Sequence, residues 1–325
     1  MAVHPATVLP YIIRRLLWTV FLLFVVSGLT FIIFYVMPTA DPAALRAGKS
    51  PTPEAVATVR KTLGLDRPPL EQYADYMGDV FTNFDFGRSY VSSAEVRPLI
   101  LSRLPNTLFL IVGAVVVWLA VGLTVGTISA VRRGSVLDRL AMGSALIAIS
   151  APVYWLGLVV LFLFSDDIGR FPLLPGSGAY ESAEGFLAKC EAMIMPWCVL
   201  ATAFAAVYAR LLRANLVEVL GEDYIRTARA KGLRERRVIV RHGIRSAITP
   251  VVTVLGLDIG ILLGGAILTE SVFNIPGVGR LAFDAIQRGD LTMIQGTTLF
   301  FALGVCLMNL IVDIAYGFLD PRVRY

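Results

Sequence analysis

Six long apolar windows divide this chain into membrane-type segments and polar connections. Each window holds enough apolar residues to cross a hydrocarbon core of about 30 Å as a helix. The windows cover residues 16–37, 108–131, 140–164, 193–212, 248–268 and 293–319. We therefore expect an all-α membrane protein with six transmembrane helices, and an even number of spans places both termini on the same side of the membrane.

Composition supports the membrane class and excludes others. Hydrophobic residues make up 56% of the chain and charged residues only 16%, more apolar surface than a soluble fold of this length could cover. The net charge of +5 is too small to indicate a nucleic-acid partner. The window 16–37 is longer than the core of a signal peptide and no A-x-A cleavage site follows it, so we expect a retained helix.

The three cysteines carry little functional information. Cys190, Cys198 and Cys306 are odd in number and lie in or beside apolar windows, which makes a disulfide framework an unsuitable explanation. We interpret them as structural thiols.

The distribution of Lys and Arg predicts the orientation, because positively charged connections stay in the cytosol. The connections 38–107, 165–192 and 271–292 have at least as many acids as bases, so we place them outside. The tails and the two other connections are basic, so both termini are predicted to be cytosolic. Their basic residues are Arg14, Arg15, Arg132, Arg133, Arg139, ten Lys or Arg from Arg210 to Arg245, Arg322 and Arg324.

The first outer connection is patterned for helices. Thr52-Pro53-Glu54 combines a cap, a proline at the first helical position and an early acid. A second amphipathic stretch covers residues 69–81. We expect a small helical segment over the mouth of the membrane bundle, with an ordered but inert connection as the alternative.

No pattern of catalysis is present in the sequence. Gly48-Lys49-Ser50 resembles the end of a phosphate-binding loop, but Ala43 stands where that loop requires glycine. The two histidines, His4 and His242, belong to no H-E-x-x-H motif, and no G-x-S-x-G motif occurs. We expect no catalytic residues, no metal site and no cofactor in this chain.

A charged stretch between residues 220 and 250 interrupts the apolar pattern. Small residues there alternate with charged ones, as in a short helix that approaches a partner closely and pairs with acids on it. Gly232 lets the chain turn after this helix, and an amphipathic piece follows with Val238, Ile239 and Val240 on its apolar side. The alternative is a basic anchor on anionic lipid.

The amino-acid pattern of this stretch favours contact with a partner protein over an anchor on lipid. The run from Asp223 to Leu233, followed by Arg241-His242-Gly243 and Pro250, resembles the EAA loop of ATP-binding-cassette (ABC) importer permeases in its peptide-class version. Arg226 and Thr227 replace the Glu and first Ala of the generic pattern, while Ala228 and Gly232 match it. Residues 14–15, 85–89, 263–273, 275–280, 309–313 and 319–322 resemble the same branch.

The resemblance implies a B-type transmembrane subunit of an oligopeptide or dipeptide importer, in the type I importer permease fold with an extracytoplasmic helical insertion. It divides the chain into a cytosolic tail and first helix (1–37), the extracytoplasmic helical segment (38–107), a five-helix core (108–319) containing a cytosolic coupling loop (213–247), and a cytosolic tail (320–325). The first helix is expected to pack around a partner.

The same resemblance implies the partners. These are a second homologous permease of the C type, two ATPase domains or subunits that bind ATP and Mg²⁺, an extracytoplasmic substrate-binding protein and membrane lipid of the bacterial cytoplasmic membrane. The implied ATPase-coupling residues are Asp223, Tyr224, Arg226, Thr227, Ala228, Arg229, Ala230, Lys231, Gly232, Leu233 and Arg237.

Two acids are candidates for the translocation pathway. Asp258 lies near the middle of the fifth window, where an ionisable group is costly. It contacts substrate or a partner, or else it is a hydrogen-bonded packing residue beside small glycines. Glu270 follows at the outer end of this window and either guards the pathway entrance or is solvated.

One alternative function stays open. A proton-coupled secondary transporter would need several intramembrane acids or histidines, and Asp258 is the one clearly central candidate. The substrate is not specified by the sequence, since permeases of this kind handle dipeptides, longer peptides, glutathione and nickel chelates.

Overall fold

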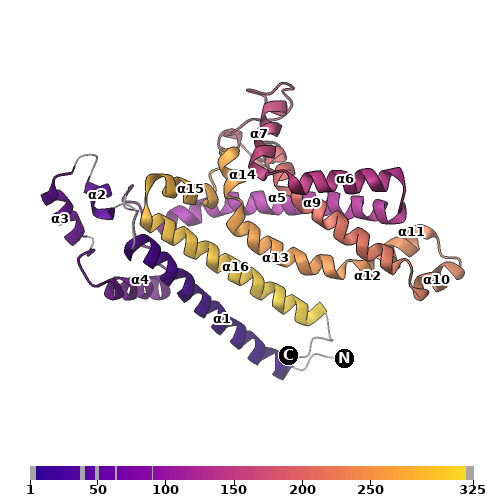
Figure 1. Cartoon of the computed structure of the whole chain (residues 1–325), viewed down its shortest axis with the longest axis horizontal. Coiled ribbons are helices and arrows are strands. Elements are labelled where there is room, and N and C mark those ends of the chain that lie inside the picture. The colour runs from indigo at the N-terminus through magenta and orange to yellow at the C-terminus, as the bar shows by residue number, and fades with distance from the viewer. Residues whose placement is uncertain (1–4, 37–40, 48–50, 63, 90, 320–325) are drawn as a thin grey trace. The chain divides into compact units, whose positions relative to one another are not determined.

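The computed structural model describes residues 5–36, 41–47, 51–62, 64–89 and 91–319, and these ranges are almost entirely helical (Figure 1). The extended pairings among them are two isolated bridges, Arg88 with Glu95 and Ser165 with Leu174. The predicted all-α class is therefore confirmed. His4, the Gly48-Lys49-Ser50 run and the predicted tail 320–325 lie outside the described residues.

Four described helices are long and apolar enough to span a membrane. They are residues 13–31 of α1 (Pro5–Phe31), α5 (Val96–Val131), α9 (Phe186–Val219) and residues 291–311 of α16 (Leu291–Leu319). Two bent helix pairs also qualify, α6 (Val136–Ser150) with α7 (Val153–Phe164), and residues 235–247 with residues 249–262 of α13 (Thr249–Gly265). The structure thus has four to six candidate spans, and six when each bent pair counts as one.

The window 140–164, predicted as one continuous helix, is broken. α6 and α7 meet at an angle of 106° around Ala151 and Pro152. Ala151 is extended (φ −79°, ψ 125°), as expected of a residue before proline, whose ring excludes the helical conformation from its predecessor. The dipeptide Ala151-Pro152 therefore explains the break.

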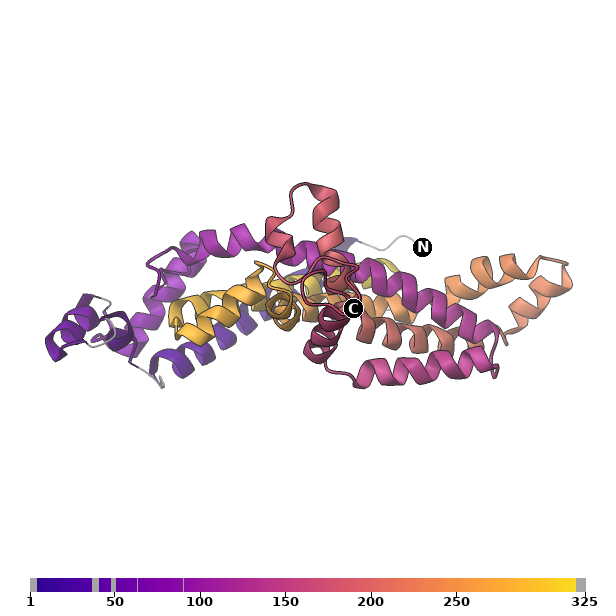
Figure 2. The same ribbon diagram turned by 90° about the horizontal axis from the view of Figure 1, so that it is seen from above.

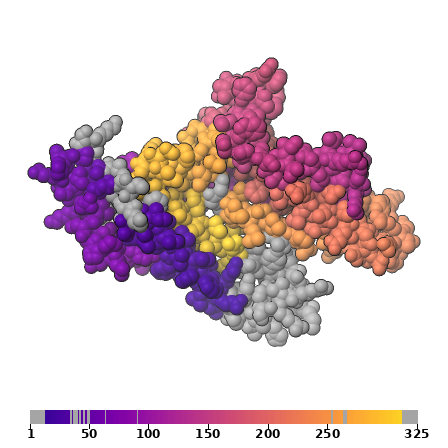
Figure 3. Space-filling view, viewed as in Figure 1, coloured from indigo at the N-terminus to yellow at the C-terminus, as the bar shows by residue number. Residues whose placement is uncertain are grey.

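The chain forms two compact units, and each is described by itself. The first comprises residues 1–107, 263–267 and 276–325, and the second comprises residues 108–262 and 268–275. Within the first unit, the first and last helices, α1 and α16, pack along each other (Figure 3).

After η1 (Ile32–Val36), the first unit continues in short helices: α2 (Pro42–Ala47), α3 (Pro53–Thr62) and α4 (Pro69–Asn83). The Ala55 amide donates to Thr52 Oγ1 over 3.3 Å, which confirms the expected cap of α3. α4 is fixed to α1, because the hydroxyls of Tyr73 and Ser27 hydrogen-bond at 2.7 Å and the Phe24 and Phe81 rings stack at 4.9 Å.

Residues 271–292 were expected to form an outer loop, but they contain α15 (Val278–Arg288). This helix buries one apolar face in the core of the first unit and ends at Gly289, which adopts a φ of 65°. The core comprises Phe86, Val96, Ile100, Val278, Leu281, Ala285, Leu291, Met293, Ile294 and Leu299. The three-to-four-residue spacing of Val278, Leu281 and Ala285 is the sequence signal for this helix.

The second unit is built on the close approach of α5 and α9. A Cβ added to Gly122 would lie 2.9 Å from the Ala205 carbonyl oxygen, and one added to Gly126 would lie 2.7 Å from that of Ala209. Because glycine has no side chain, the two backbones can touch there. The unit continues through α8 (Ala179–Ser182), α10 (Asp223–Ala230), α11 (Glu235–Arg237), η2 (Val238–Ile244), α12 (Arg245–Ala247) and most of α14 (Ile267–Val272).

Candidate coupling site

The charged stretch folds as a short helix, α10, that extends beyond the C-terminal end of α9 (Figure 2). One face of α10 is apolar, since Ile225 and Ala228 are buried against Val238 of η2. Val219, Leu220 and Leu233 pack around this cluster. α10 is therefore anchored to its own chain on one face and leaves the other face exposed.

Gly232 ends the helix as expected from the sequence. Its φ of 76° is in the left-handed region, where glycine has no steric penalty. The Gly232 amide donates to the Arg229 carbonyl over 2.9 Å, and the Leu233 amide donates to the Ala228 carbonyl over 3.4 Å. These two bonds form a Schellman motif, which stops α10 and redirects the chain into α11.

The exposed face carries the polar rim that a partner would meet. The side chains that point outward are those of Asp223, Tyr224, Arg226, Thr227, Arg229, Ala230 and Lys231. The Arg229 guanidinium forms an ion pair with Glu235 at 2.7 Å. The hydrogen bonding in this pair raises the pKa of Arg229 above its ordinary value. Arg226 contacts Asp223 at 3.4 Å. The rim is thus an ordered, mixed-charge surface along the whole of α10.

The small residues of the expected docking helix do not all lie on its exposed face. Ala228 is buried on the inner face, while Ala230 and Gly232 are exposed. Leu233 is half-buried behind the turn, and Arg237 is exposed on α11. In η2, Val238 is buried as predicted, but Val240 is 56% exposed, so the prediction of a common apolar side was wrong for Val240. Residues so close together along a helix point in different directions.

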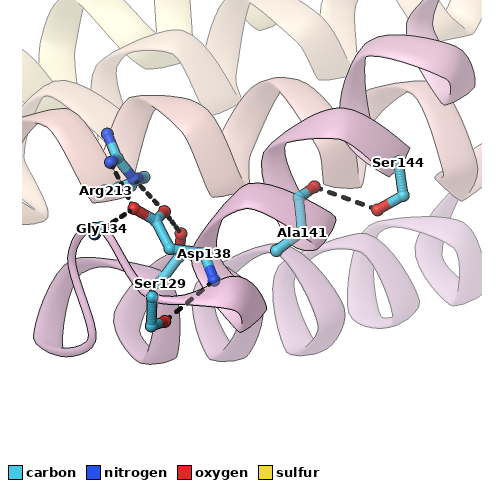
Figure 4. Close-up of polar contacts among 7 residues, drawn as sticks. Ser129, Gly134, Asp138, Ala141, Ser144 and Arg213 are labelled. Atoms are coloured by element: carbon cyan, nitrogen blue, oxygen red, sulfur yellow. Dashed lines mark hydrogen bonds and ion pairs between the residues drawn. The ribbon is translucent and has the colours of Figure 1, made fainter.

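A cluster around Asp138 ties α5, α6 and α9 together (Figure 4). The Asp138 carboxylate accepts from Arg213 Nε at 2.6 Å and from a second Arg213 nitrogen at 2.7 Å. It also accepts from the Ser129 hydroxyl, and from the Gly134 amide at 2.8 Å. Asp138 is buried, with 5% of its side chain exposed, against 27% for Arg213. This pair was not predicted from the sequence, although opposite charges at the edges of two apolar windows were a signal for it.

The two acids proposed for the pathway have different surroundings. Asp258 on α13 is half-buried and accepts a hydrogen bond from the Tyr208 hydroxyl of α9 at 2.8 Å. Glu270 on α14 is fully buried, so it is not the solvated acid that one interpretation expected. Among the described residues, no group of three His, Cys, Asp or Glu side chains could hold a metal ion.

The turn after α14 is held to the first half of α5. The Asn106 side-chain amide donates to the Pro276 carbonyl over 2.8 Å, and the Val278 amide donates to Thr107 Oγ1 over 2.9 Å. The Asp85–Ser89 run has a similar structural role, since the Ser89 hydroxyl donates to the buried Asp290 carboxylate. These contacts give the outer part of the first unit a defined surface.

Comparisons with known proteins identify relatives of this chain. Residues 122–325 match the family described as binding-protein-dependent transport system inner membrane component, and residues 8–111 match its N-terminal companion family. The glutathione transport system permease protein GsiC of Escherichia coli strain K12 is 41% identical over 317 residues, which cover 98% of this chain and 99% of that protein. The GsiC protein of Shigella dysenteriae serotype 1 is similar to the same extent.

Both the family match and this identity extend over nearly the whole chain, with the charged stretch and α10 inside the matched region. The resemblance drawn from the residues is therefore confirmed. This chain belongs to the inner membrane components of binding-protein-dependent transport systems and is a permease of the ABC importer type.

Proposed function

We propose that this permease is the B-type subunit of an ATP-driven importer for short peptides, glutathione among them. The observation that carries the proposal is α10, a short helix anchored by Ile225 and Ala228 with a charged face directed away from its own chain. The relatives named for glutathione transport support the substrate class, because glutathione is a tripeptide. The subunit itself hydrolyses nothing, and partner ATPases bind ATP and Mg²⁺.

The assembly follows from the family and the charge distribution. This subunit pairs with a second, homologous permease of the C type to enclose the pathway, and two ATPase domains bind on the cytosolic side. Both termini lie in the cytosol, since the basic connections are retained there. The exposed apolar side chains of α1, such as Leu17 at 66% and Phe21 at 55%, suit lipid or the partner permease.

The proposed mechanism is a lever. ATP brings the two ATPase domains together, and α10, held in a groove on one of them, moves with it. The bundle then changes from an inward-open to an outward-open state, which requires the two states to differ in substrate affinity.

Substrate arrives from an extracytoplasmic binding protein. Its docking surface comprises the outer helices within residues 52–103 and the turn 276–279. The hydrogen bonds of Asn106 and Thr107 support this assignment, because they hold the turn in a fixed conformation. A rigid surface binds a partner with less loss of conformational entropy than a mobile loop does.

Co-purification with the products of the neighbouring genes tests the ATPase contact. We expect the tagged wild-type subunit to retain the ATPases, and Arg226→Glu to lose them, because Arg226 is exposed on α10 and reversal of its charge opposes acidic groups on the partner. Arg170→Glu is the matched control, an equal charge reversal at an exposed residue of the 165–192 connection, on the predicted outer side. Retention of the ATPases by Arg226→Glu at the control level would contradict the proposed contact.

A further inference from the structure

The contacts of Asp138 connect three parts of the second unit. Its carboxylate accepts hydrogen bonds from the last turn of α5, from the α5–α6 turn and from α9, through Ser129, Gly134 and Arg213. A buried ion pair costs desolvation, and an apolar pair of similar volume is often at least as stable. What the pair adds is a fixed geometry, because the planar guanidinium holds the carboxylate by two parallel hydrogen bonds.

The same stretch of α9 is continuous with the α10 anchor. Arg213 is six residues before the helix ends at Val219, and Val219 and Leu220 pack against the cluster that holds Ile225. Gly243 of η2 closes this arrangement, since a Cβ there would be 3.0 Å from Leu216 and 3.4 Å from Leu220. α10, η2 and the end of α9 therefore form one packed block, and Arg213 fastens the α5–α6 hairpin to it.

We propose that the Arg213–Asp138 pair transmits the displacement of α10 to the α5–α6 hairpin, so that the ends of α5, α6 and α9 move as one body when the ATPases close. This inference rests on the proposed function. Both residues are positioning residues, because neither touches substrate or nucleotide, and their loss uncouples ATP hydrolysis from transport without removing the ATPase contact surface on α10.

Arg213→Lys tests this transmission with little risk to folding. Lysine keeps the charge beside Asp138 but lacks the planar fork that makes two directed bonds. The complete importer is reconstituted in lipid vesicles with its binding protein, and radiolabelled glutathione and trialanine are tried separately. We expect substrate imported per ATP hydrolysed to fall about fivefold or more, the lower end of typical coupling effects, while ATP hydrolysis stays within about twofold of wild type.

Two further variants sharpen the test. Asp138→Asn keeps the side-chain size but removes the charge, and we expect it to lower the same ratio. Arg139→Gln is the matched control, because it removes an exposed charge from the adjacent residue, whose guanidinium donates to the Gly134 carbonyl over 3.3 Å and not to Asp138. We expect this control to import substrate with the wild-type ratio.

The outcomes of this experiment distinguish failure of the proposed transmission from failure of the proposed function. A wild-type ratio in Arg213→Lys overturns the proposal, since directed bonds would not be needed for coupling. Failure of Arg213→Lys to assemble, when Arg139→Gln assembles, also overturns it and assigns the pair to folding. A wild-type complex that shows no ATP-dependent import of either substrate would instead refute the proposed function.

Discussion

At the scale of single residues, the surroundings of Asp258 favour a role in helix packing. Its carboxylate accepts from the Tyr208 hydroxyl at 2.8 Å, and the Tyr208 ring lies beside the ring of Trp118 at 5.8 Å. An interhelical hydrogen bond of this kind contributes about 0.6 kcal/mol on average in a membrane protein. The sequence left a pathway role and a packing role open here, and the hydrogen bond from Tyr208, 50 residues away, supports the packing role.

Asp258→Asn is therefore expected to leave uptake unchanged. The asparagine carbonyl oxygen can still accept from Tyr208, so neither packing nor the pathway is altered. The measurement is labelled-peptide uptake by cells that express equal amounts of wild-type or variant permease. Lost uptake with normal membrane assembly would show that the charge itself acts in transport.

Gly232 provides a second test at this scale. Gly232→Val forces a β-branched side chain into the left-handed region, which costs about 1–2 kcal/mol and distorts the end of α10. Gly232→Asn is the matched control, because asparagine tolerates this conformation. Among the described residues other than its two chain neighbours, no atom lies within 4 Å of a Cβ added to Gly232, so backbone strain is what the substitution tests. We expect co-purified ATPase to fall for valine and to be retained for asparagine, and equal retention would show that the turn tolerates any residue.

At the scale of helices, apolar length predicted most spans, and local breaks were missed. The windows at 108–131 and 193–212 correspond to α5 and α9, both of which extend further than their apolar parts. The bend between α6 and α7 follows from Pro152, which a count of apolar residues does not weigh. α15 was missed because it is short and amphipathic, and its apolar face is covered by helices far apart in the sequence.

The close contact of α5 with α9 predicts that one added methyl group, in Gly126→Ala, destabilises the protein. Gly126→Ala would place a Cβ 2.7 Å from the Ala209 carbonyl oxygen and 3.2 Å from Leu212 Cβ, so one helix must move. Overpacking of this kind costs about 1–3 kcal/mol. Gly143→Ala on α6 is the matched control, since nothing lies within 4 Å of its added Cβ.

We expect Gly126→Ala to lower the melting temperature of the purified permease complex, as measured by the loss of monodisperse protein on heating. Gly143→Ala is expected to leave it unchanged or raised, because alanine favours a helix over glycine. Equal melting of the two variants would mean that α5 and α9 do not approach as closely as the structure shows.

At the scale of the whole molecule, the sequence identified the family and the exposed helix, but not how α10 is connected to the rest. The EAA-like residues are close together in the chain, so their pattern is visible without a structure. Asp138 and Arg213 are 75 residues apart, and neither charge indicates its partner until α6 and α9 are placed side by side. Long-range pairing of this kind separates what a sequence can predict from what it cannot.

Import into sealed vesicles tests the central claim most directly. Vesicles contain this permease with its partner subunits, the binding protein is added outside, and labelled glutathione uptake is measured with ATP inside or with a pH gradient and no ATP. We predict uptake that requires ATP and the binding protein and persists when the pH gradient is dissipated. Uptake driven by the pH gradient without ATP, in these vesicles and in vesicles that contain this chain alone, would contradict an ATP-driven importer and identify a proton-coupled transporter.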